Sequence, residues 1–105
     1  MAELQTLDPA QLAASAAAAA RLLRALANEH RLLILCQLAG GERSVGQLQP
    51  VVGLSQSALS QHLAVLREEQ LVATRRESQT IWYRIDDPAA LRVVETLADI
   101  FCPPN

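Results

Sequence analysis

The sequence has no lysine, few aromatic residues and only two cysteines. Aromatic residues make up 3% of its 105 residues, and half of the residues are hydrophobic. No apolar stretch approaches the roughly 20 residues that a membrane span needs. The start of the chain, residues 1–10, lacks the basic and apolar regions of a secretory signal. We therefore expect one small cytoplasmic domain, spanning residues 1–105, that does not enter a membrane.

Sequence features of enzymes are also missing. There is no glycine-rich phosphate loop, and no nucleophile and base stand at a motif spacing. The two cysteines, Cys36 and Cys102, lie in distant segments, which excludes a Cys-x-x-Cys redox enzyme. The sequence therefore predicts a protein that is not an enzyme.

Alanine and leucine occur 18 times each, which favours helices. Capping residues and apolar periodicity divide the chain into five of them. Asp8, Asn28, Ser44, Ser55 and Asp87 are the expected N-caps. The predicted helices cover residues 9–26, 29–38, 45–52, 56–69 and 88–101. The second helix is apolar nearly all round, which is typical of a central core helix.

The helical spacing of apolar residues ends before residue 71, and residues 71–85 are rich in β-branched and aromatic side chains. Two strands, 71–76 and 80–85, with a short connection between them predict a β-hairpin. The short helix, glycine-containing turn and capped second helix at 44–69, followed by this hairpin, form a winged helix-turn-helix pattern. The expected fold is mainly α, with five helices, two strands and the hairpin as the wing.

The second helix of the pair should lie in a major groove of double-stranded DNA. Its polar face carries serine and glutamine, which can bond to bases and phosphates, and Arg75 and Arg76 on the hairpin could reach the backbone or the minor groove. The formal net charge of −2 does not favour DNA. A merely solvated helix face, in a winged helix that binds another protein, is therefore the alternative.

Four stretches resemble the ArsR/SmtB family of dimeric bacterial repressors: LANEHRLLIL (26–35), LSQSALSQHLAVLR (54–67), LV (71–72) and IWYRI (81–85). The resemblance implies a homodimer built from the first and last helices (8–27 and 87–102) that binds an inverted-repeat operator until an effector releases it. The DNA-facing residues that it implies, carried over by position, are Ser55, Gln56, Ser57, Ser60, Gln61 and His62.

The chain departs from the family pattern at two places. Gln70 stands where a glycine usually closes the recognition helix, so we expect a non-glycine residue in a left-handed conformation there. The hairpin tip, residues 78–80, lacks the usual basic residues. The wing should therefore contribute less affinity for DNA than in relatives.

The metal sites of the family also look absent. Ser44 and Gly46 stand where a Cys-x-Cys site would place its thiols, and the last helix has acidic residues but no histidine. Zn²⁺ and thiophilic metals favour Cys and His ligands. His30 and His62 lie in different elements and are expected to be scaffold or groove residues. We expect no bound metal or cofactor.

Cys36 and Cys102 are the remaining effector candidates. A cysteine among leucines is usually a small buried hydrophobic residue, and a terminal thiol can be incidental. As a pair, however, they resemble those of the BigR/SqrR/HlyU-type subgroup, which implies a sensor of reactive sulfur species or oxidants. In that subgroup a disulfide or polysulfide bridge would release the DNA. A regulator with inert cysteines and another effector remains the alternative.

Overall fold

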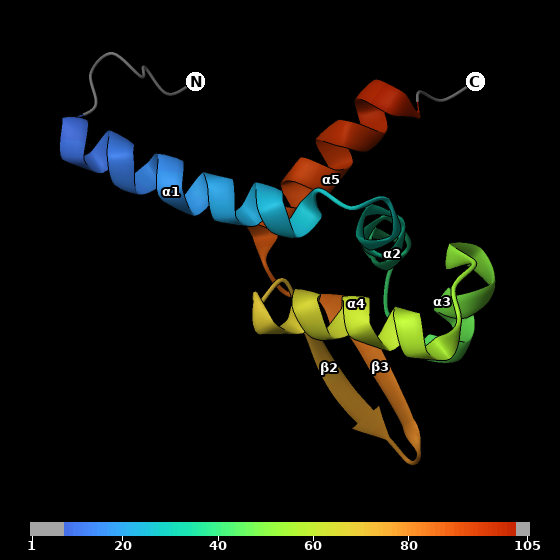
Figure 1. The fold of residues 1–105 in the computed structure, drawn as a ribbon. Helices are drawn as coiled ribbons and strands as arrows, with labels where there is room; N and C mark the ends of the chain where they lie inside the picture. Colours follow the sequence, from blue (N-terminus) through green and yellow to red (C-terminus); the bar gives the residue numbers. More distant parts are fainter. Residues whose placement is uncertain (1–7, 103–105) are drawn as a thin grey trace.

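Five helices and three strands follow one another in the structure, a computed structural model that describes residues 8–102. Figure 1 shows their arrangement. In chain order the elements are α1 (Pro9–Leu26), α2 (Glu29–Ala39), β1 (Arg43–Ser44), α3 (Val45–Val52), α4 (Gln56–Glu68), β2 (Val72–Glu77), β3 (Thr80–Ile85) and α5 (Pro88–Phe101). The predicted winged helix-turn-helix fold is confirmed, and each predicted helix is present within one residue at its ends.

Local side-chain caps explain where most helices begin. The Asn28 side chain accepts hydrogen bonds from the backbone N–H groups of His30 and Arg31. Ser44 and Gln47 form a reciprocal capping box at the start of α3. Ser55 and Asp87 cap α4 and α5 more simply, each accepting one hydrogen bond, from the backbone N–H of Ala58 and of Ala89 respectively. Asp8 is the exception: its side chain caps nothing, and α1 begins instead at Pro9, whose fixed φ suits the first helical position.

The sheet has three antiparallel strands in the order β1-β3-β2. β2 and β3 form the predicted hairpin, and Ser78 in the loop between them has a positive φ of 56°. The third strand, β1, pairs Arg43 with Tyr83 and Ser44 with Trp82. Sequence analysis missed β1, because two residues are too few to show a strand periodicity.

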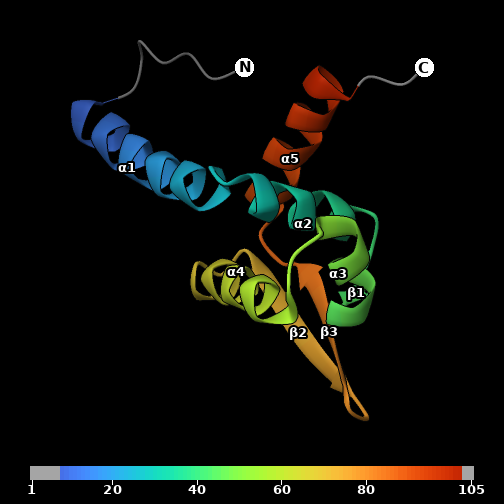
Figure 2. The ribbon, with the colours of Figure 1, turned by 45° about the vertical axis from the view of Figure 1, so that its right-hand side comes forward.

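The hydrophobic core lies between α2, α4 and the sheet. Its fully buried side chains include Ile34 and Leu35 of α2 and Leu59 of α4. The central position predicted for the second helix is thus confirmed. The core holds α3 and α4 at a fixed angle above the wing, which Figure 2 shows from the side.

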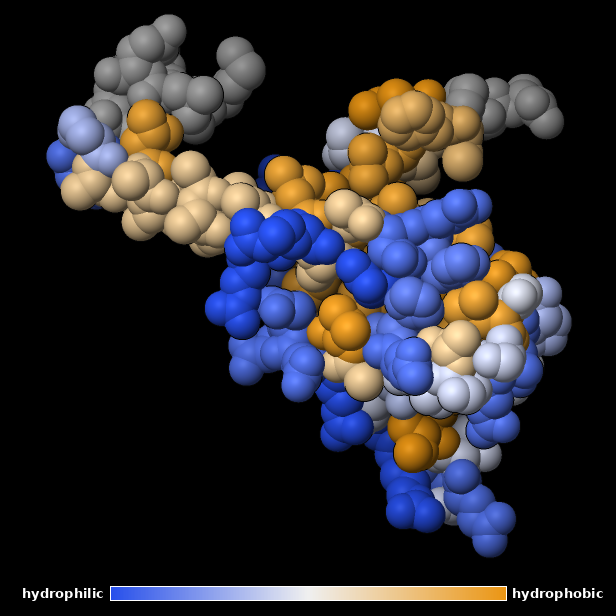
Figure 3. Space-filling view, viewed as in Figure 1, coloured by the Kyte–Doolittle hydropathy of each residue, from blue (hydrophilic) through white to orange (hydrophobic). Residues whose placement is uncertain are grey.

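Two helices extend beyond this core. In α1 only Ala25 and Leu26, in its last turn, are fully buried, Leu22 packs partly against the core, and the N-terminal part of the helix projects away from the molecule. The far end of α5 also projects, with Ile100 61% and Phe101 75% exposed. Apolar side chains cover parts of both projecting helices in Figure 3. Neither these helices nor any other within residues 8–102 is long and apolar enough to cross a membrane.

Candidate DNA interface and thiol pair

The start of α4 presents a polar face to solvent. Gly53, with a left-handed φ of 75°, makes the turn between α3 and α4. Ser55 then caps α4 by accepting a hydrogen bond from the N–H of Ala58. All of the predicted DNA-facing residues except one are exposed and lie together here: Ser55, Gln56, Ser57, Ser60 and Gln61. Hydroxyl and amide groups at this spacing can hydrogen-bond to base edges and phosphates.

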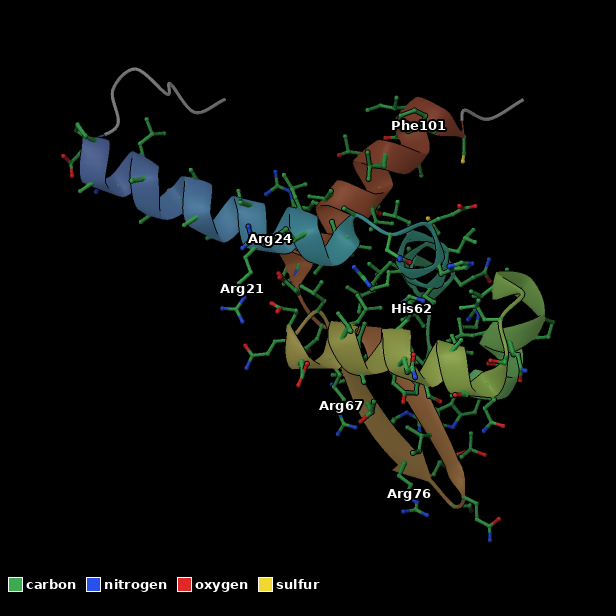
Figure 4. The ribbon with its side chains drawn as sticks, viewed as in Figure 1. Arg21, Arg24, His62, Arg67, Arg76 and Phe101 are labelled. Atoms are coloured by element: carbon green, nitrogen blue, oxygen red, sulfur yellow. The ribbon has the colours of Figure 1, made fainter. Side chains whose placement is uncertain are left out.

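His62 is the residue that does not join this face. It is half-buried, and its ring centroid lies 5.6 Å from that of His30 on α2. Figure 4 shows it in the space between α4 and α2. Partial burial, and then the charges of Arg31 and His30, lower the pKa of His62 below its usual value of 6.5. The ring therefore belongs to the contact between two helices.

The two wing arginines differ in their surroundings. Arg75 forms ion pairs with Glu42, at 2.9 Å, and with Glu77, at 3.0 Å, and its guanidinium lies over the Trp82 ring. These contacts hold Arg75 across the sheet and offset its charge. Arg76 is exposed and donates one hydrogen bond to the Ser78 carbonyl. No acidic side chain among residues 8–102 forms an ion pair with it.

One further cation lies on the exposed side of α4. Arg67 is exposed, and it lines a hollow of about 370 Å³ with Ser60 and Ala64 of the same helix and Tyr83 of β3. Sequence analysis did not select Arg67 as a DNA contact. The helical spacing of residues 57, 60, 64 and 67 would have pointed to it, since such residues share one face.

The two cysteines lie on helices that pack together. Cys36 is on α2 and Cys102 follows α5, and both thiols are free and exposed. Cys36 is thus not the small buried residue that a cysteine among leucines usually is: its neighbours Ile34 and Leu35 are buried in the core, and Cys36 is exposed. Partial burial raises the pKa of the Cys36 thiol, and the nearby Cys102 raises it further. Because α2 and α5 are in contact, the two exposed thiols belong to one packed pair of helices.

No such grouping exists for a metal. Within residues 8–102, His, Cys, Asp and Glu side chains nowhere gather in threes at a distance that could hold an ion.

An exposed, capped second helix beside a hairpin defines a winged helix-turn-helix transcriptional regulator. Residues 28–74 match the family described as "Bacterial regulatory protein, arsR family". The chain belongs to this family of DNA-binding regulators, which are not enzymes. It is 47% identical over 95 residues to the transcriptional regulator YgaV of Escherichia coli K12, covering 90% of this chain and 96% of that protein.

Solved structures agree with this assignment. Reduced HlyU from Vibrio cholerae N16961 is 47% identical and superposes with a TM-score of 0.85, covering 88% of this chain and 97% of that chain. The transcriptional repressor BigR from Xylella fastidiosa is 39% identical, with a TM-score of 0.83, and the match covers 93% of this chain and all of that one (100%). The predicted resemblance to the BigR/HlyU-type relatives is confirmed.

Proposed function

We propose that this regulator is a cytoplasmic repressor that binds an inverted-repeat operator as a homodimer. In this proposal residues 44–69 enter the major groove, and residues 71–85 form the wing that contacts the backbone. The exposed side chains at the start of α4 read the bases: Ser55, Gln56, Ser57, Ser60 and Gln61. Arg76 contacts a phosphate, while His62 and Arg75 support the helix and the wing that carry these contacts.

The dimer forms through the two projecting helices, residues 8–27 and 87–102. Their exposed apolar side chains, among them Leu23 and Phe101, favour burial against a second copy of the chain. A two-fold axis between the copies would place the two α4 helices about 34–36 Å apart, one turn of DNA.

We further propose that a bridge between Cys36 and Cys102 releases the operator. The observation that carries this proposal is that α2 and α5 pack together and so bring two exposed cysteines, distant in sequence, to one pair of helices. Burial raises the pKa of the Cys36 thiol, which disfavours its thiolate form, and we therefore propose that Cys102 attacks first and Cys36 second. The bridge would tie α5, a dimerisation helix, to α2, which packs on α4.

The chemistry balances with a polysulfide as the oxidant. The Cys102 thiolate attacks a polysulfide sulfur and expels a sulfide or thiolate. The Cys36 thiolate then attacks the sulfur chain on Cys102 and expels a second sulfide or thiolate. The two cysteines together lose two protons and two electrons, and the polysulfide gains the electrons. Attack on the Cys102 sulfur itself leaves a disulfide, and attack further out leaves a longer sulfur bridge.

The test compares reduced and polysulfide-treated protein by fluorescence anisotropy on the DNA upstream of its own coding region. The intact mass of the same samples reports the bridge. We expect tight binding when reduced, and roughly 10- to 100-fold weaker binding once an intramolecular link appears, the range of typical allosteric coupling.

Single variants identify the thiols and separate the alternatives. Cys36→Ser and Cys102→Ser should each bind DNA normally and stop responding to polysulfide. A confirmed bridge without loss of affinity, or a Cys36→Ser variant that still responds, would instead favour inert cysteines and another effector. A reduced protein that binds no DNA would favour a winged helix that recognises another protein.

A further inference from the structure

Three arginines line a second hollow, where α1, α2 and the end of α4 meet. Arg21 and Arg24 of α1 and Arg31 of α2 meet Val65 and Glu69 at the end of α4, around a volume of about 380 Å³. We call this group of five residues the arginine hollow. Three guanidinium groups with one carboxylate give it a net positive charge in a chain whose formal net charge is −2.

The three guanidinium groups have different partners. Arg21 is paired with Glu69 at 2.7 Å. Arg31 donates to the backbone carbonyls of Ala25 and Arg24 at the end of α1, which fixes its position and leaves other N–H groups of its fork for a ligand. The exposed Arg24 side chain has no ion-pair or hydrogen-bond partner within residues 8–102. A fixed cation beside an unpartnered one is suited to a phosphate, which guanidinium groups bind through paired N–H donors.

The position of the hollow points to the source of that phosphate. Val65 and Glu69 continue the helical row of α4 that begins at Gln61, since residues four apart share a face. Val65 is therefore about 6 Å along the helix axis from Gln61. In Figure 3, strongly hydrophilic side chains gather at the end of α1 and continue across α4 to the wing on the same side of the molecule. Figure 4 labels four of the arginines along this path, Arg21, Arg24, Arg67 and Arg76.

We propose that the arginine hollow binds a backbone phosphate of double-stranded DNA beside the groove that α4 occupies. Arg24 makes the direct contact, Arg31 adds its fixed charge, and Arg21 with Glu69 holds α1 against α4. The site would extend the DNA interface beyond the helix-turn-helix and the wing. The proposal depends on the DNA binding of the proposed function.

The test measures binding of a fluorescein-labelled 30-bp duplex of the upstream DNA, and of a scrambled duplex, as a function of salt. Loss of one phosphate contact lowers the slope of log K against log salt by about 0.9, which corresponds to about 8-fold in affinity per tenfold change in salt. We expect Arg24→Ala to have a salt slope smaller by about 0.9 than the wild type, and a lower affinity. Both effects should appear on both duplexes, because phosphates carry no sequence information. Arg24→Lys should retain most of both.

Arg43→Ala on β1 is the control, since it removes the same charge from a residue outside the proposed DNA contacts and the dimerisation helices. It should bind like the wild type, provided that both have the same mass in solution. Thermal melting of Arg24→Ala checks that the loss of its charge from the last turn of α1 leaves the fold intact.

Three outcomes would overturn the proposal. If Arg24→Ala kept the wild-type affinity and salt slope, the arginine hollow would not be a DNA contact, and the proposed DNA binding by the helix-turn-helix would be unaffected. An equal loss in Arg43→Ala would mean that overall charge, and not the arginine hollow, sets the affinity. A wild-type protein that binds neither duplex at low salt would refute this site and the proposed function together. Calorimetry with pyrophosphate covers the free-ligand source: Arg24-dependent binding of pyrophosphate with unchanged DNA affinity would reassign the arginine hollow to a free phosphate ligand.

Discussion

Gln70 shows how a single residue can carry strain in this fold. Its φ of 62° lies in the left-handed region, where a β-carbon crowds the backbone. The conformation is needed because the chain reverses there: the N–H of Leu71 donates to the Leu66 carbonyl at 2.9 Å and closes the end of α4. The resemblance to the ArsR/SmtB family predicted this conformation, since Gln70 stands where the family pattern usually has a glycine.

Replacing Gln70 with glycine should therefore stabilise the protein. We expect Gln70→Gly to raise the free energy of unfolding by about 0.5–1 kcal/mol, the relief of left-handed strain less the greater freedom of glycine in the unfolded chain. Urea denaturation followed by circular dichroism measures the change. Gln70→Ala keeps the β-carbon and should bring no gain. An equal gain in both variants would show that the side chain, and not the backbone, is the cause.

Residue-level features could be predicted from the sequence when they are local, and not when they join distant segments. The caps at Asn28, Ser44 and Ser55 were predictable because each acts within three residues of itself. The pairing of Arg75 with Glu42 was not, because it spans 33 residues and depends on the position of β1. Helical periodicity also could not tell whether His62, beside the buried Leu59 and Leu63, faces a groove or α2. Such contacts are set by tertiary packing.

At the scale of elements, the contact between α2 and α4 depends on pH. The folded protein holds His62 at a lowered pKa, so the unfolded chain binds more protons near pH 6.5. Stability should therefore be fully present above this pH and decrease as the pH falls through it. The carboxyl group of Glu42, whose pKa is lowered by its hydrogen bond with Arg75, loses its contribution only below its usual 4.5.

Comparing urea denaturation at about pH 7.5 and pH 5.5 tests this contact. We expect a lower free energy of unfolding at the acidic pH, and His62→Gln should reduce the difference. His30→Gln should keep most of it, because burial is the first cause of the shift and His30 the last. A wild-type protein that is equally stable at both values would contradict the assignment.

At the scale of the whole molecule, the projecting helices predict the oligomeric state. Light scattering coupled to size exclusion should give twice the chain mass of 11.4 kDa. Leu23→Glu on α1 and Ile100→Glu on α5 place charges among exposed apolar side chains and should each shift the protein toward the monomer, since burying an unpaired charge is costly. Val51→Glu is the control: Val51 is 50% exposed, yet lies on α3. A dimer unaffected by both α1 and α5 variants would exclude this interface.

The hydrogen bonds from Arg31 to the end of α1 have a mechanical consequence. They fasten the last turn of an 18-residue helix, about 27 Å long, to α2, and the ion pair of Arg21 with Glu69 holds the neighbouring turn to α4. The helix can therefore tilt about its last turn, which Arg31 holds. A tilt of about 10° about this turn would move the N-terminal end of α1 by roughly 5 Å. In the proposed dimer, a small rearrangement around α2 in one subunit would thus become a large displacement where α1 contacts the second subunit.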